Sequence, residues 1–303
     1  MNAVLRTMLE GVVDYAGLFP PAKLSMREAV AEYSQILSSS HSWLVDRFAC
    51  TAERLDELGK ELAADPPSNP VQLSVIGSPN LDREGWKRGI ERDGELMTSF
   101  LRDSHGLAEI QAYEVKTPDQ KHLEEYVRDL RQFTGVDVFT ELGWTPELND
   151  SLALLAEMET AFAKMRTGGL VKEAFPSSSQ LAQLISQCCQ LDLTFKLTAG
   201  LHHPLPHEDA ETGARHHGFL NVLAACALAI SEELSAKEIA DILDETRPKE
   251  FHFRRDGISL HEHRASPEDV ENSRTLLVSF GSCSVAEPVA DLEKLGFLGK
   301  VSR

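Results

Sequence analysis

The chain has 303 residues, of which 42% are hydrophobic and 26% are charged, a globular balance that excludes a disordered or collagen-like protein. Its 30 Lys and Arg residues against 48 Asp and Glu residues give a formal net charge of −18. A surface this acidic argues against nucleic acid or an anionic membrane as a partner. We therefore expect a small-molecule substrate, and the sequence leaves homo-oligomer formation open.

Short apolar runs rich in β-branched residues alternate with longer amphipathic runs along the whole chain. The predicted strands are Gly11–Tyr15, Trp43–Cys50, Val71–Ile76, Glu109–Val115, Asp137–Leu142, Phe162–Met165, Leu193–Thr198 and Leu276–Phe280. The predicted helices are Met26–Ser38, Ala52–Ala64, Asp82–Ser99, Gln120–Phe133, Pro146–Glu159, Ser178–Gln190 and Gly218–Leu234. Eight strands alternating with helices predict one α/β domain over residues 1–303, a (β/α)8 TIM barrel. An open doubly wound sheet is less favoured, because no GxGxxG turn follows the first strand.

The stretch between the seventh and eighth predicted strands is longer than one barrel unit requires. Residues 201–270 include the helix that begins at Gly218, a second predicted helix near Ser235–Glu245 and a predicted hairpin around Asp256-Gly257. We interpret this stretch as a long insertion between strands 7 and 8, packed over or beside the carboxyl-terminal mouth of the barrel.

The ends and the cysteines of the sequence bear on where the protein works. Met1–Glu10 carries Arg6 and no continuous apolar run, which is unlike a signal peptide. The most apolar stretch, Leu223–Ile230, is too short to cross a bilayer. Since none of the five cysteines falls in a CxxC pair, we predict a cytoplasmic protein with reduced thiols.

Catalytic groups of such barrels lie at the carboxyl ends of the strands. The charged residues that we assign to those ends are Asp14, Asp46, Arg47, Glu114, Lys116, Glu141, Lys164, Arg166 and Lys196. Two of them, Lys164 and Lys196, lie inside apolar strands, where an unpaired lysine is poorly tolerated.

These two strand lysines have two interpretations. If the ammonium groups approach each other, burial and repulsion should lower the pKa of Lys164 by roughly 3 units, and the neutral amine could form a Schiff base with a carbonyl compound. Alternatively, each lysine pairs with a carboxylate such as Glu114 or Glu141. Spacing alone favours neither.

Glycine-rich turns follow the last three predicted strands, in the segments 167–169, 198–200 and 281–284. Glycine lets the backbone approach an anion closely, and free N–H and hydroxyl groups satisfy phosphate oxygens. We predict that an anionic group of the substrate is held by Arg166, Gly168, Gly200, Gly281 and Ser282.

Six segments, taken in order, resemble motifs of the class I deoxyribose-phosphate aldolases, which are Schiff-base aldolase barrels. They are Val13-Asp14-Tyr15-Ala16-Gly17-Leu18, Val75-Ile76-Gly77-Ser78-Pro79, Ala108-Glu109-Ile110-Gln111, Ala163-Lys164-Met165-Arg166-Thr167-Gly168, Phe195-Lys196-Leu197-Thr198-Ala199-Gly200 and Phe280-Gly281-Ser282-Cys283-Ser284. The resemblance implies that Lys164 forms the Schiff base, that Lys196 tunes it, and that the turn after the eighth strand belongs to a phosphate site.

The chain departs from this family at three places. Gln111 stands where the family has a proton-relay aspartate on strand four, so that role is vacant unless Glu114 or Glu141 takes it. Arg166 stands where a small hydroxyl residue is usual. The insertion after strand seven has no counterpart in the family.

These observations predict a carbon–carbon lyase that acts on a small anionic or phosphorylated carbonyl compound and uses no cofactor. Lys164 is the predicted nucleophile and Lys196 its pKa partner. Asp14 and Glu114 are predicted to transfer protons.

A histidine-rich segment offers a rival chemistry. His202, His203 and His207 follow the seventh strand, and such a cluster could hold a divalent metal for a hydrolase or another kind of lyase. The segment has no HxH or HExxH spacing, so we predict no metal and place His202 and His203 at the substrate mouth as acid–base groups. A third hypothesis is a non-catalytic barrel that binds a small anion, with the two lysines as counter-charges.

Overall fold

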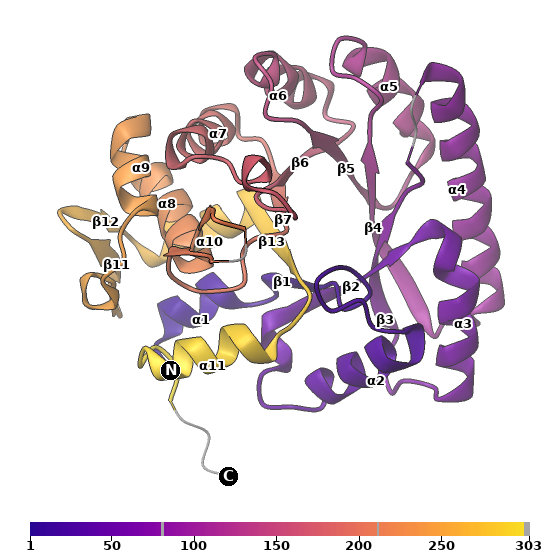
Figure 1. Ribbon diagram of the computed structural model, residues 1–303, viewed down its shortest axis with the longest axis horizontal. Helices are drawn as coiled ribbons and strands as arrows, with labels where there is room; N and C mark the ends of the chain where they lie inside the picture. The colour runs from indigo at the N-terminus through magenta and orange to yellow at the C-terminus, as the bar shows by residue number, and fades with distance from the viewer. Residues whose placement is uncertain (80–81, 211, 300–303) are drawn as a thin grey trace.

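The computed structural model describes residues 1–79, 82–210 and 212–299, and within them eight parallel strands close into a barrel (Figure 1). The barrel strands are β1 (Val13–Tyr15), β2 (Val45–Thr51), β3 (Val71–Ile76), β4 (Ala108–Lys116), β5 (Asp137–Leu142), β6 (Phe162–Arg166), β7 (Phe195–Thr198) and β13 (Leu277–Ser282). Their order around the barrel is β1-β13-β7-β6-β5-β4-β3-β2, and β2 pairs back to β1. The predicted (β/α)8 architecture is confirmed.

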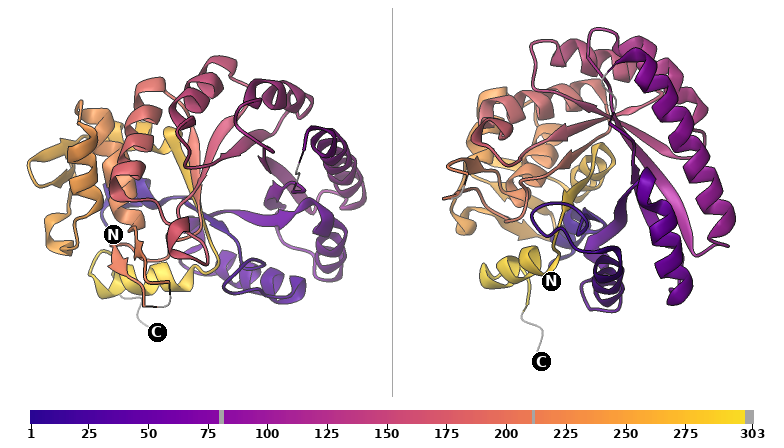
Figure 2. Two further views of the ribbon diagram at one scale, coloured as in Figure 1. Left: turned by 45° about the horizontal axis from the view of Figure 1, so that its top comes forward. Right: turned by 45° about the vertical axis from the view of Figure 1, so that its right-hand side comes forward.

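Helices surround the strands and follow them in the chain (Figure 2). The helices that follow the barrel strands are α2 (Met26–Leu37), α3 (Leu55–Ala64), α4 (Arg83–Asp103), α5 (Leu123–Asp129), α6 (Leu148–Met158), α7 (Ser178–Leu191), α8 (Phe219–Ser231) and α11 (Ala286–Lys294). Short 3₁₀ turns lie at Ser42–Leu44, Ala52–Arg54, Leu130–Gln132, Lys172–Ala174 and Pro248–Glu250. In the part of the chain that the structure describes, no helix combines the length and the apolar character needed to cross a membrane.

Local capping signals set several of the helix starts. Before α7, Ser177 Oγ accepts a hydrogen bond from the Gln180 backbone N–H, and Gln180 Oε1 accepts one from the Ser177 N–H. The helix that begins at Pro267 has the same reciprocal cap between Ser266 and Asp269. Such caps satisfy N–H groups that the first helical turn leaves without partners. Because the signal is local, the sequence places the start of α7 at the correct residue.

Alternation along the barrel strands separates the apolar core from the barrel interior. On β6, Ala163 and Met165 belong to the apolar core between strands and helices, and on β7 Phe195 and Leu197 do the same. Successive side chains of a strand point to opposite faces. The intervening lysines of these strands therefore point into the barrel.

The long segment between β7 and β13 divides into two parts. Residues 201–210 and 212–218 follow the carboxyl end of β7 and contain β8 (His207–Glu208), which pairs antiparallel with β9 (Arg215–His216). The elements after α8 are α9 (Ala236–Leu243), β10 (His252–Arg254), β11 (Gly257–Leu260), β12 (His263–Ala265) and α10 (Pro267–Leu276). The predicted hairpin thus gains β12, which pairs with β11.

The second part of this segment lies on the outer flank of the barrel. Helix α9 packs on α7 and α8, and the β10-β11-β12 sheet packs on α8, α10 and the N-terminal helix α1 (Ala3–Leu9) (Figure 1). Asn2 Nδ2 also donates a hydrogen bond of 3.1 Å to the Phe253 carbonyl. Of the described residues of the insertion, only 201–210 and 212–218 therefore lie where the sequence analysis expected the whole insertion. The apolar side chains of α9, Ile239, Ile242 and Leu243, are buried on this flank, where the outer helices offer an apolar surface.

Arg274 of α10 forms hydrogen bonds that connect this flank to the barrel. Its guanidinium donates hydrogen bonds to the carbonyls of Leu277, Val278 (2.7 Å) and Glu10 (3.2 Å). Arg274→Met should lower the free energy of unfolding by about 3 kcal/mol, because the part-buried carbonyls of Leu277 and Val278 lose their donor. Urea denaturation measures the change. Arg88→Met, which alters an exposed ion pair on α4, is the control and should leave the unfolding midpoint unchanged. An equal effect of both substitutions would contradict the stabilising role of the Arg274 hydrogen bonds.

Candidate active site

The four residues predicted to be catalytic meet inside the barrel. Lys164 and Lys196 are register partners on β6 and β7. Glu114 of β4 lies between them, with Oε2 2.8 Å from Lys164 Nζ and Oε1 2.5 Å from Lys196 Nζ. Asp14 of β1 forms an ion pair with Lys196 through Oδ2. None of the four residues is more than 4% exposed.

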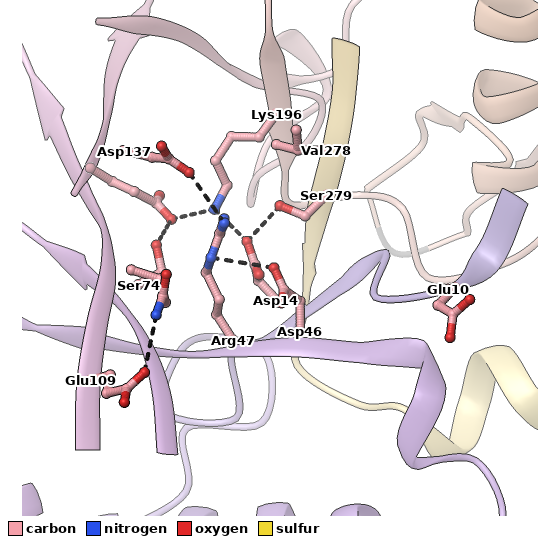
Figure 3. Close-up of polar contacts among 12 residues, drawn as sticks. Glu10, Asp14, Asp46, Arg47, Ser74, Glu109, Asp137, Lys196, Val278 and Ser279 are labelled. Carbon is pink, nitrogen blue, oxygen red and sulfur yellow. Dashed lines mark hydrogen bonds and ion pairs between the residues drawn. The ribbon is translucent and has the colours of Figure 1, made fainter. Parts of the chain in front are cut away.

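Two serines anchor the carboxylates of this cluster. Ser74 Oγ donates a hydrogen bond of 2.5 Å to Glu114 Oε1, and Ser279 Oγ donates one of 2.7 Å to Asp14 Oδ2 (Figure 3). The sequence analysis missed both serines. The available signal was a small hydroxyl residue within an otherwise apolar run, at a position that strand alternation directs inward.

A third carboxylate reaches Lys164 from β5. Glu141 Oε2 lies 3.1 Å from Lys164 Nζ, and Glu141 and Lys164 are register partners on neighbouring strands. Gln111 takes no part in the cluster: it is exposed, and its Nε2 donates to Glu109 at 3.3 Å. The pairing of β3 with β4 passes from Ile110 to Ala112 through a register shift. Glu114 is therefore the β4 carboxylate that reaches the lysines.

The pKa of Lys164 shifts in the opposite direction from the one expected from the sequence. Burial opposes its positive charge, but the carboxylates of Glu114 and Glu141 outweigh burial and raise the pKa of Lys164. Burial likewise opposes the charge of Glu114, yet Lys164 and Lys196 hold the pKa of Glu114 well below its usual range. The predicted fall in the Lys164 pKa was wrong, because a carboxylate lies between the two ammonium groups. Of the two sequence interpretations, the structure shows carboxylate pairing.

The turns after β6 and β7 are locked to each other at the carboxyl end of the barrel. Thr167 Oγ1 donates to the Ala199 carbonyl at 2.5 Å. Gly200 has φ +79°, and a Cβ there would lie 2.6 Å from the Thr167 carbonyl oxygen; a Cβ on Gly168 would lie 2.7 Å from the Gly200 Cα. Only glycine tolerates both the left-handed conformation and this backbone approach.

The remaining predicted binding residues also lie at this end. Gly281 is the register partner of Thr198 on β7, and the Ser282 carbonyl accepts a hydrogen bond of 2.7 Å from the Ala16 N–H. Arg166 is the last residue of β6 and is exposed. Since Arg166 follows Lys164 by two residues, strand alternation puts both on the same face. In the described residues the Arg166 side chain forms no ion pair, so it is free to meet an anion at the mouth.

Asp46 and Arg47 lie at the opposite end of the barrel from the one assigned to them. They are the second and third residues of β2, which continues to Thr51. Arg47 pairs with Asp46 at 3.3 Å and with Asp137, the first residue of β5, at 3.5 Å (Figure 3). The sequence analysis was wrong here because it assigned these two charged residues to the carboxyl end of β2, whereas they lie at its amino end.

The histidines after β7 form a row of rings beside α11. His203 Nδ1 lies 2.5 Å from Asp291 Oδ2, and His202 Nδ1 lies 3.6 Å from Glu287 Oε2. The His203 and His207 ring centroids are 4.5 Å apart, and burial is the main factor that lowers the pKa of His202 and His207. Over residues 1–79, 82–210 and 212–299, no group of three or more His, Cys, Asp or Glu residues is arranged to hold a metal ion. The metal hypothesis therefore has no ligand set to support it in this part of the chain.

No protein-family model matches the chain, and no curated protein matches it. The function is therefore inferred from the geometry of this site.

Proposed function

We propose that the protein is a carbon–carbon lyase of the Schiff-base aldolase type, acting on a small carbonyl compound. The observation that carries this proposal is the pair of buried lysines on β6 and β7, joined by the carboxylate of Glu114. A buried ion cluster contributes little to stability compared with apolar residues of the same volume. Strongly perturbed ionisable groups gathered at one place favour catalysis instead.

Lys164 is the proposed nucleophile. It pairs with Glu141, the most exposed carboxylate of the cluster, whereas Lys196 pairs with the more deeply buried Asp14 and Glu114. Its imine with a carbonyl carbon would become an iminium ion, which withdraws electrons from the adjacent carbon–carbon bond as that bond breaks. Lys196 contacts both Asp14 and Glu114. It is therefore placed to position the two carboxylates and to pass a proton between them.

Asp14 and Glu114 are the proposed proton-transfer groups. Asp14 Oδ2 is occupied by Lys196 and Ser279. Asp14 Oδ1 is buried and has no hydrogen-bond partner in the described residues. A buried oxygen without a partner is energetically costly, and a proton or hydroxyl group of a bound substrate would remove that cost.

The residues at the mouth of the barrel favour a substrate with an anionic group. Arg166 supplies a positive charge on the face of β6 that carries the nucleophile. The substrate-contact residues that we propose are Arg166, Gly168, Gly200, Gly281, Ser282, His202 and His203. The five cysteines are unpaired, which supports the expectation of a cytoplasmic enzyme.

A non-catalytic anion-binding barrel is a weaker proposal. In that hypothesis the two lysines would attract the bound anion. Glu114 and Glu141 already neutralise Lys164, and Asp14 and Glu114 contact Lys196. The lysine charges are thus paired within the protein.

Borohydride trapping tests the proposal. The purified protein is incubated with acetaldehyde, glyceraldehyde, glyceraldehyde 3-phosphate or pyruvate, reduced with sodium borohydride and mapped by peptide mass spectrometry. We expect a stable adduct on Lys164 with at least one compound, and protein unfolded in urea should lose this selectivity. Labelling confined to exposed lysines would contradict the proposal.

A further inference from the structure

Glu141 occupies a different environment from the other carboxylates of the cluster. Its side chain is 12% exposed, compared with 4% for that of Glu114. It lies next to the last residue of β5, at the carboxyl end of the barrel. In the described residues its only ion pair is the one of 3.1 Å with Lys164. Glu141 is thus in contact with the amine and closer to solvent.

Glu114 is a poor acceptor for the proton of Lys164. Its Oε1 accepts hydrogen bonds from Ser74 and Lys196, and its Oε2 pairs with Lys164. The two lysines keep the pKa of Glu114 low in spite of its burial. Protonating Glu114 would break contacts that hold the whole cluster together. Asp14 is paired with Lys196 rather than with Lys164.

The amine of Lys164 nevertheless has to lose a proton before it can attack a carbonyl carbon. The neighbouring carboxylates raise the pKa of Lys164, so the ammonium form predominates at neutral pH. Imine chemistry at this site therefore requires an acceptor within hydrogen-bonding distance.

We propose that Glu141 is a catalytic residue that accepts this proton from Lys164 and later delivers a proton to the departing hydroxyl group. This inference rests on the imine chemistry proposed above and names the residue that makes that chemistry possible at neutral pH.

The proposed step balances without any co-reactant. The Lys164 ammonium transfers one proton to the Glu141 carboxylate, and the nitrogen lone pair forms the bond to the carbonyl carbon. A proton then moves from nitrogen to oxygen, which gives a neutral carbinolamine. The Glu141 carboxylic acid protonates its hydroxyl group, the carbon–oxygen bond breaks, and water leaves. The iminium ion and the Glu141 carboxylate are the products.

Glu141→Gln separates this role from a purely electrostatic one. The charged groups in contact with Lys164 are Glu114 from β4 and Glu141 from β5, and Lys196 from β7 shares Glu114 with it. Arg166 lies two residues further along the same face of β6 and forms no ion pair in the described residues. Removing a proton acceptor should slow the labelling of Lys164 by acetaldehyde and cyanoborohydride at pH 7 by about 100-fold. Removing only a negative charge should speed it, because the ammonium form would lose a stabilising partner.

The measurement is the ratio of variant to wild-type labelling rates at each pH from 6 to 10, which cancels the pH dependence of the reductant. For Glu141→Gln we expect the ratio to rise toward one as the pH increases, because a growing fraction of the amine is then neutral without the help of a proton acceptor. Glu141→Asp keeps a carboxylate and should recover part of the rate at pH 7. Asp137→Asn, which removes a carboxylate from the other end of β5, is the matched control and should keep the wild-type rate.

The labelling results distinguish failure of the Glu141 role from failure of the lyase proposal. Faster or unchanged labelling of Lys164 in Glu141→Gln would overturn the role of Glu141 while leaving the lyase proposal standing. Absence of Lys164 labelling in the wild-type protein would overturn the lyase proposal itself, and this inference with it. If Glu141→Gln does not fold, as judged by circular dichroism, Glu141→Ala takes its place: faster or unchanged labelling of Lys164 in that variant contradicts the inference.

Discussion

Replacing Lys164 with alanine should abolish the borohydride-dependent adduct and lower lyase turnover by a factor on the order of 10⁴ or more, the scale seen when an enzyme loses its nucleophile. The reason is geometric: Lys164 Nζ is the amine that contacts both Glu114 and Glu141. Peptide mass spectrometry with each carbonyl compound measures the adduct. Lys172→Ala is the control, since Lys172 is exposed in the turn after β6, and it should behave as wild type.

Lys196→Ala should give a different result from Lys164→Ala. The adduct on Lys164 should still form, but about tenfold more slowly at pH 7. Without Lys196 a nearby positive charge is lost, and Glu114 no longer shares its negative charge between two ammonium groups, so the pKa of Lys164 rises further. The labelling rate should therefore shift to higher pH. Labelling of Lys196 in Lys164→Ala, or complete loss of labelling in Lys196→Ala with the fold intact, would reverse the assigned roles.

Removing the carboxylate that joins the lysines should be the most destabilising substitution in the site. In Glu114→Gln, Lys164 and Lys196 lose their shared partner, while Gln can keep a contact with Ser74. Breaking a buried ion pair from one side typically costs about 3–5 kcal/mol, and we expect a loss of that size at pH 7. Asp241→Asn, which removes one carboxylate from an exposed pair on α9, should cause no measurable change.

The pH dependence of this loss follows from the direction of the Glu114 shift. The pKa of Glu114 is held below its ordinary value of 4.5 in the folded protein, so its charge stabilises the fold above that pH. As pH falls below about 4.5, the unfolded chain gains a proton first and the contribution declines. The difference in unfolding free energy between wild type and Glu114→Gln should therefore shrink between pH 5 and pH 3, measured by urea denaturation. A constant difference over this range would contradict the assigned charge state.

Several features of the barrel could be predicted from local sequence. The strand limits of β3 and β5 match the predicted ranges, because an apolar alternating run is recognisable within six residues. The start of α7 matches because its cap is made by residues three positions apart. The length of the insertion could be recognised in the sequence, but its position on the barrel could not. The outer helix surface that α9 covers is formed by helices from other parts of the chain.

The buried charge cluster could be predicted only in part from the sequence. Two lysines in apolar strands stood out, because a charge at a core position is conspicuous in any window of five residues. Their effect on each other was predicted with the wrong sign. Whether two neighbouring ammonium groups repel or share a counter-ion depends on what the other strands contribute, and Glu114 comes from β4, 82 positions before Lys196.

The sequence by itself determined the alternation of strands and helices, the capped helix starts and the inward position of Lys164 and Lys196, because each of these follows from the chemistry of residues within a few positions of one another. Only the tertiary structure decided which carboxylates meet the lysines. The register shift beside Gln111 and the closure of β1 against β13 bring Glu114 and Asp14 to the lysines, and Asp14 lies 182 positions from Lys196. The stagger of strands in a closed barrel is a property of the whole sheet, so no local pattern could encode it.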